Sequence, residues 1–283
     1  MKIKTVTNSI LFLAFGMLSI QATAQKINMP APSPLQTVVQ KFGVGEITIE
    51  YSRPSVKDRT IFGDVVPFGK IWRTGANAAT KVTFSDDVKL DGNAVKAGTY
   101  ALYSIPNKDA WEIMLYSDLT LGGNVADYKA ENEVVRFKVK ANKIPMKIES
   151  LMINIGDVAP AEAVMTLLWE NTVISFKVTT EIDAKVMKSI DESMKSEKPD
   201  YFRAAGYYFD NNKDLKQALI WVDKAVAENP TAFYMFYLKA RIEYKLGDKK
   251  AGKASAEKTI ELAKTAKNDD YIAMANKLLA ENK

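Results

Sequence analysis

The chain has 283 residues, a net charge of +5 and a pI near 9.0, and it contains neither cysteine nor histidine. This composition excludes disulfides, His-ligated zinc, and Ser-His-Asp or Cys-His catalytic triads. Acidic and basic residues are mixed along the whole sequence and form no basic stripe. The positive charge therefore does not indicate nucleic-acid binding.

Residues 1–24 have the pattern of a secretory signal peptide. Two lysines precede an apolar run at 10–20, which is too short to span a bilayer, and "ATA" at 22–24 is an A-x-A cleavage site. Cleavage there makes Gln25 the first mature residue. No later stretch is long and apolar enough for a membrane helix. We therefore expect a soluble, exported protein, either periplasmic or extracellular, without a membrane span after cleavage.

Residues 25–180 have the two-residue period of β-strands. Apolar and polar residues alternate in runs such as EITIEYS, TKVTF and TYALYSI, and turn formers such as Asp91-Gly92-Asn93 separate these runs. Many short strands at this spacing predict an antiparallel β-sandwich or barrel-like domain. The runs at 164–169 and 173–178 predict one hairpin that turns at Glu170-Asn171.

Residues 181–283 have the 3.6-residue period of amphipathic helices. Two segments in this half match at an offset of 34 residues, which is the period of tetratricopeptide repeats. The first copy fills the small, aromatic and proline positions of that repeat with Phe202, Ala205, Gly206, Phe209, Ala218, Val222, Ala225 and Pro230. We predict α+β by segregated domains, with C-terminal tetratricopeptide-like helix hairpins. These helices are expected to pack on the β half, or on each other through a helix at 182–194.

One long ordered pattern resembles a known family. The chain reads Y-S-R-P, then K-x-R-x-I-F-G, then P-x-G-x-x-W-R-T-G-A-N, then A-G-x-Y-x-L. This order resembles the exported bacterial β-domains catalogued as domain of unknown function 2911. The resemblance covers residues 30 to 178 and implies export and a β-fold, and members with appended tetratricopeptide-like helices fit the rest. It implies no defined activity. Ala78 and Leu121-Gly122-Gly123 depart from the family, whose members often carry an acid and a Trp-Gly pair there.

The stretch GKIWRTGANAAT, residues 69–80, is the strongest candidate binding loop. It combines a planar fork of donors on arginine, a stacking face on tryptophan and short hydrogen-bonding side chains. Two further arginines lie close to it in sequence. The predicted residues for binding an anionic or sugar ligand are Arg53, Arg59, Trp72, Arg73, Thr74 and Asn77.

A structural interpretation of this loop competes with the binding one. Arg73 would then pair internally with Asp58 or Asp64, and the polar residues around it would only satisfy the backbone of a turn. The cationic segment around Arg53 would be an exposed, salt-bridged loop. A cavity around the arginines would favour ligand binding, whereas internal ion pairs would favour the structural interpretation.

In the helical half, five residues occupy the positions that line the groove of tetratricopeptide repeats. They are Arg203, Tyr207, Tyr237, Arg241 and Tyr244. The resemblance implies contact with an extended peptide, and Arg and Tyr are enriched at interaction hot spots. The alternative is that the tyrosines pack against the neighbouring helices.

These observations predict an exported, non-enzymatic binding or scaffold protein without a cofactor or a metal. One alternative is a hydrolase-like enzyme for glycan or ester substrates, which the density of Arg, Asp and Tyr over residues 51–77 supports. The missing His and Cys, and the lack of an obvious carboxylate pair, argue against catalysis. A second alternative is a purely structural envelope component.

Overall fold

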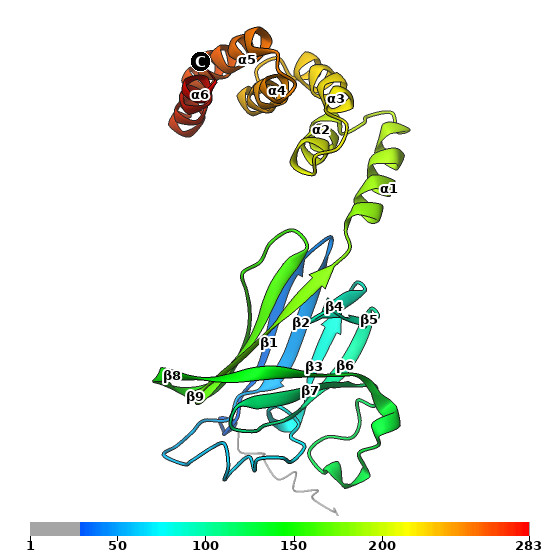
Figure 1. The fold of residues 1–283 in the computed structure, drawn as a ribbon, viewed down its shortest axis with the longest axis vertical. Helices are drawn as coiled ribbons and strands as arrows, with labels where there is room; N and C mark the ends of the chain where they lie inside the picture. The colour runs from blue at the N-terminus through cyan, green and yellow to red at the C-terminus, as the bar shows by residue number, and fades with distance from the viewer. Residues whose placement is uncertain (1–28, 283) are drawn as a thin grey trace, which may run out of the picture.

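A β-rich part is followed along the chain by a helical part (Figure 1). The computed structural model describes residues 29–282, and the predicted signal peptide lies outside this range. The segregated α+β fold predicted from the sequence is confirmed: β9 ends at Thr180 and α1 begins at Asp183. Within the described residues, no helix is long and apolar enough to cross a membrane.

The strands pair antiparallel in the order β1-β2-β3-β6-β7-β8-β9-β4-β5. Their bounds are β1 Leu35–Phe42, β2 Gly45–Ser52, β3 Ala76–Phe84, β4 Val88–Leu90, β5 Asn93–Val95, β6 Gly98–Ile105, β7 Ala110–Tyr116, β8 Glu133–Gly156 and β9 Glu162–Thr180. The predicted turn at Asp91-Gly92 connects β4 to β5, and both residues have positive φ.

Two long strands, β8 and β9, cross in front of the other strands in Figure 1. The first part of β8 pairs with β7, with Trp111 opposite Val139, and its last part pairs with β9, with Ile153 opposite Leu167. Each of these four side chains is buried, because alternate residues of both strands face one core. The long strands therefore join the two layers of the sandwich.

The hairpin predicted at Glu170-Asn171 is wrong, because β9 runs through these residues without reversing. Glu170 adopts a left-handed φ of 55°, and the Asn171 side chain donates to the carbonyl oxygens of Ile144 and Met146 on β8. At this position, residues that commonly form turns instead make a bend within a strand. Hydrogen bonds to the partner strand stabilise this bend.

A second apolar cluster lies on the outer face of the sheet. Its buried members are Ala79, Ala101, Tyr103, Met114 and Tyr116. The segment 117–132, which contains the short helical turns Val125–Asp127 (η1) and Ala130–Asn132 (η2), packs over this cluster. Tyr116 and Tyr128 stack with ring centroids 4.5 Å apart. We call segment 117–132 the flap.

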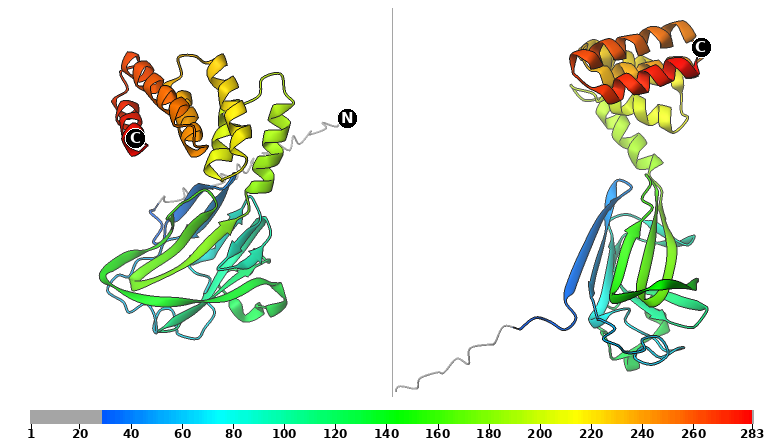
Figure 2. Two further views of the ribbon diagram at one scale, coloured as in Figure 1. Left: turned by 45° about the horizontal axis from the view of Figure 1, so that its top comes forward. Right: turned by 90° about the vertical axis from the view of Figure 1, so that its left-hand side faces the viewer.

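The helices form an array beyond one end of the sandwich (Figures 1 and 2). Their bounds are α1 Asp183–Met194, α2 Tyr201–Asp210, α3 Leu215–Glu228, α4 Phe233–Lys245, α5 Lys249–Thr265 and α6 Asp269–Glu281. Consecutive helices from α2 onward pack on each other. Side chains of Asp or Asn cap the N-termini of α2, α3, α5 and α6, which explains where these helices begin.

Helix α1 connects the two parts. On the β side, the Lys185 ammonium pairs with Asp86. On the helical side, Asp183 accepts a hydrogen bond from the Tyr207 hydroxyl at 2.8 Å and pairs with Lys213 at 2.7 Å. The helices α2 to α6 pack on each other, whereas α1 is joined to them mainly by these polar contacts of Asp183, so the expected packing through the 182–194 helix is met only in part.

Candidate functional site

Trp72, one of the predicted ligand residues, lies in the main core with only 8% of its surface exposed. Its ring stacks on Trp169, with centroids 5.8 Å apart, and meets Phe62 and Trp111 edge to face. Its indole N–H donates to the Gly75 carbonyl at 3.0 Å. The ring is therefore part of the packing of the sandwich, and neither of its faces is free for a ligand.

Thr74 and Asn77 hold the corner between Trp72 and β3. Both adopt left-handed backbone angles, with φ of 54° and 58°. The buried Thr74 hydroxyl lies 2.9 Å from the Ser104 hydroxyl, and the Asn77 amide donates to the Ser52 hydroxyl at 3.1 Å. These hydrogen bonds offset the cost of an unfavourable backbone conformation, so both side chains stabilise the turn.

Arg53 and Arg59 bind backbone carbonyl oxygens instead of carboxylates. The Nε atom of Arg53 donates to the Leu151 carbonyl at 2.9 Å. The guanidinium of Arg59 donates to the Val56 and Ser55 carbonyls at 3.0 and 2.7 Å. Both arginines therefore brace the segment that follows β2, and their positive charges are not neutralised by an ion pair within residues 29–282.

Arg73 points away from Trp72, toward the outer face of the sheet and the flap. A Cβ atom added to Gly123 in the flap would lie 2.7 Å from Nη1 and 3.0 Å from Cζ of Arg73. The Nε atom is buried and has no hydrogen-bond partner. The internal pairing considered for this arginine is absent from the described structure, where Asp58 instead pairs with Lys147 at 3.6 Å.

A buried tyrosine, Tyr103, lies close enough to Arg73 for the two groups to interact electrostatically. Its hydroxyl donates to the carbonyl of Gly122 at 2.8 Å, which ties the flap to β6. Burial raises the pKa of Tyr103 to about 12, nearby Tyr116 and Asp118 act in the same direction, and the Arg73 cation opposes them. The hydroxyl is therefore neutral at physiological pH and supplies no negative charge to Arg73.

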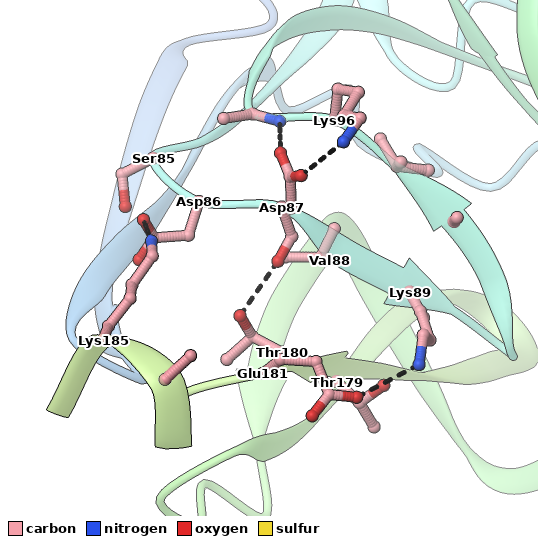
Figure 3. A pocket seen from close by; sticks show the side chains of 14 residues that line it. Ser85, Asp86, Asp87, Val88, Lys89, Lys96, Thr179, Thr180, Glu181 and Lys185 are labelled. Atoms are coloured by element: carbon pink, nitrogen blue, oxygen red, sulfur yellow. Dashed lines mark hydrogen bonds and ion pairs between the residues drawn. The ribbon is translucent and has the colours of Figure 1, made fainter. Parts of the chain in front are cut away.

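A separate hollow of about 700 Å³ lies where the sandwich meets α1 (Figure 3). The β4–β5 hairpin, the end of β9 and the first turn of α1 surround it. Three ion pairs ring its mouth: Lys96–Asp87 at 2.8 Å, Lys89–Glu181 at 3.1 Å, and Lys185–Asp86. Because each charge already has an opposite partner, the hollow offers no net charge to an ionic ligand.

The predicted partner-binding residues divide between two places. Arg203 and Tyr207 line a hollow of about 390 Å³ beside α1, and Tyr207 is bonded to Asp183 there. Tyr237 and Arg241 lie farther along, on α4. Helix α1 therefore lies beside these two α2 residues and engages Tyr207, while the Arg203 side chain stays exposed.

The α4 residues belong to a continuous row of aromatic side chains. The Arg241 guanidinium lies 4.4 Å from the Phe209 ring centroid and 5.8 Å from that of Tyr237. Tyr237 meets Tyr271 of α6 edge to face at 5.6 Å, and Tyr271 in turn meets Phe233 at 4.9 Å. We call Phe233, Tyr234, Tyr237, Arg241 and Tyr271 the aromatic row.

Tyr244 lies outside the aromatic row, at the contact between α4 and α5. A Cβ atom on Gly252 would come within 2.8 Å of its ring, so glycine is needed for this close approach. Burial raises the pKa of the Tyr244 hydroxyl. The geometry gives Tyr244 a packing role between two helices, which is the alternative considered for the tyrosines.

Residues 33–178 match the family described as Protein of unknown function (DUF2911). This range is more than half of the chain. The chain belongs to this family. No curated protein and no solved structure matches the chain.

Family membership covers the sandwich, the corner at 69–80 and the flap, whereas the helices lie beyond the matched range. The family has no assigned function, so chemistry must be argued from the side chains. Within residues 29–282, no group of three His, Cys, Asp or Glu side chains is placed to hold a metal ion. The features that sequence reasoning missed are the flap and its tyrosines, because their contacts join residues far apart in the chain.

Proposed function

We propose that this protein is an exported binding protein without catalytic activity. Its helical half holds a protein partner on the aromatic row, and its sandwich holds a polar ligand at the Arg73 end. The aromatic row is the observation that carries the proposal. Tyr234 is 38% exposed, and Phe233, Tyr237, Arg241 and Tyr271 are each only partly buried.

Two physical arguments support a partner at this row. Aromatic residues and arginine contribute most to the binding energy of protein interfaces, because they bury a large area at a small entropic cost. The guanidinium of Arg241 is also fixed in place by Phe209 and by Asp210, whose carboxylate is 3.8 Å away. A side chain that is already ordered loses little freedom when a partner binds.

The 34-residue period supports an extended peptide as the segment that occupies the row. In tetratricopeptide-like hairpins the first helix of each pair lines a common groove, and α2, α4 and α6 hold these positions in the proposed assignment. The side chains of the row then face one strand-like segment of the partner. Neither alternative function, a hydrolase or a purely structural component, gains a specific observation of comparable weight.

Site-specific photo-cross-linking in the producing cell tests the partner. A photoreactive phenylalanine analogue at Tyr234 is expected to trap a discrete partner, and Tyr237→Ala with Arg241→Ala is expected to abolish the product. The control position is Ile220, which is 51% exposed on α3, outside the row. Identical products from Tyr234 and Ile220, or none from Tyr234, would contradict the proposal.

A further inference from the structure

Arg73 differs from every other arginine of the chain. The sequence contains six arginines. Five have a hydrogen bond or an ion pair in the structure: Arg53, Arg59, Arg136, Arg203 and Arg241. Arg73 has neither within residues 29–282, and its Nε atom is buried. The fold therefore places one guanidinium under the flap without supplying an acceptor for it.

A buried guanidinium without an acceptor is energetically unfavourable unless another group accepts its hydrogen bond. A buried donor without an acceptor costs about 1–3 kcal/mol, and more when the group is charged. Internal arginines normally pair with a carboxylate, because the planar fork matches two oxygens. The Nε donor of Arg73 is therefore one that an oxygen anion would satisfy.

Arg73 as a whole is only partly buried where it meets the flap. Gly123, which is itself exposed to solvent, lies directly against the guanidinium. Any larger residue at 123 would collide with Nη1. The buried Tyr103 supports the flap through its hydrogen bond to the neighbouring Gly122.

We infer that Arg73 is the counter-ion for the carboxylate of a small ligand that binds at the Gly122-Gly123 edge of the flap. The inference rests on the ligand-binding half of the proposed function and names its ligand class. Arg73 offers a single positive charge, which matches a monoanion. Phosphate dianions generally require several positive charges or a cluster of backbone N–H groups.

Nuclear magnetic resonance of the arginine Nε–H groups tests this directly on the purified protein. Acetate is the probe, and its neutral analogue acetamide is the matched control. We expect acetate to shift the Arg73 Nε–H resonance to saturation, and acetamide or an equal concentration of sodium chloride to leave it unchanged. The resonances of Arg53 and Arg59, which already donate to carbonyls, serve as internal controls and should not move.

Two variants locate the effect. Gly123→Ala should displace the guanidinium and abolish the acetate shift, whereas Asn124→Ala changes the same segment and should retain it. Gly123 does not have a positive φ, so alanine fits its backbone and the fold should survive, as circular dichroism can verify. A full acetate response in Gly123→Ala would overturn the proposed position of the site.

Further titrations separate this inference from the broader function. If inorganic phosphate shifted the Arg73 resonance and acetate did not, the carboxylate class would be overturned, but an anion-binding site would remain. If only a neutral sugar shifted the Arg73 resonance, the ligand-binding function would stand, but the role of Arg73 as a counter-ion would be overturned. No response to any probe, or an equal response at the exposed Arg203, would overturn the site altogether.

Discussion

The indole of Trp72 stacks on that of Trp169, with ring centroids 5.8 Å apart and planes inclined by 18°. Trp72 comes from the corner that precedes β3, and Trp169 from the middle of β9. Both rings are buried. The pair therefore fastens the W-R-T-G-A-N corner to the second layer of the sandwich, and it fixes the direction in which the neighbouring Arg73 points.

Replacement of Trp72 by alanine should lower the free energy of unfolding by about 3–5 kcal/mol, because it removes a buried aromatic ring and leaves a cavity. Trp72→Phe should cost less, since it keeps part of the ring contact. Urea denaturation of both variants measures the difference. A loss below 1 kcal/mol for Trp72→Ala, roughly the range of surface substitutions, would contradict the core role.

The raised pKa of Tyr103, about 12, predicts a loss of stability in alkali. The folded state holds the phenolic proton more tightly than the unfolded state, whose tyrosine titrates near pH 10. The stabilisation is therefore complete below about pH 10 and is lost as the pH rises toward 12. Urea unfolding should show a shallower decline for Tyr103→Phe than for the wild type over this range. Tyr100→Phe, on the opposite face of β6, is the control, and equal declines in all three proteins would refute the prediction.

Glu243 on α4 is predicted to destabilise the protein near neutral pH. Only 5% of the residue is exposed and its Oε2 atom has no partner, although Lys239 lies 3.7 Å from Oε1. Burial raises the pKa of the carboxyl, so the folded state resists its ionisation. Its contribution to stability is present below the unfolded pKa, about 4.3, and is lost as the pH rises through the folded value.

Glu243→Gln should therefore raise the melting temperature at neutral pH, and the gain should shrink near pH 4. Lys239 keeps Asp223 as a partner at 2.7 Å, so the substitution leaves no unpaired cation. Glu257→Gln, an exposed change on α5, is the matched control. The quantity to compare is the melting temperature of Glu243→Gln minus that of the wild type. If this difference were lower at neutral pH than at pH 4, the carboxylate would be stabilising.

The Asp86–Lys185 ion pair should set the orientation of the helices more than the stability of the fold. Half of the Lys185 side chain is exposed, and such pairs contribute about 0–1 kcal/mol. Asp86→Ala should leave the melting temperature nearly unchanged but broaden the distribution of interdomain distances in small-angle X-ray scattering. Asp87→Ala, which breaks the neighbouring pair with Lys96, is the control. An unchanged distribution in Asp86→Ala would show that packing alone orients α1.

Local patterns predicted much of the fold. The alternation in EITIEYS and TYALYSI identifies β2 and β6, and the apolar positions of the first predicted helix identify α1 to within a residue. The errors occurred where a local signal was ambiguous. Glu170-Asn171 has turn chemistry but only bends β9, since the pairing with β8 continues on both sides. The strand β1 was not predicted, because the apolar residues of its LQTVVQKF run do not alternate with polar ones, although the burial of its side chains does alternate.

The candidate site was less predictable than the fold. The composition of the 69–80 stretch singled out Trp72, Thr74 and Arg73 together, yet the structure buries the first two in packing and turn hydrogen bonds. Only Arg73 retains unused donors. That distinction depends on Gly123, fifty residues away, which no local pattern connects to the corner.

A thermal-shift series on wild type beside Arg73→Ala tests most directly whether the sandwich binds a ligand. The panel contains carboxylate-bearing glycans and cell-wall fragments, their neutral counterparts, and phosphates. A ligand that binds only the folded state raises the melting temperature by mass action. We predict a rise with a carboxylate-bearing compound in wild type and none in Arg73→Ala. A panel without any shift, or equal shifts in both proteins, would contradict ligand binding at Arg73.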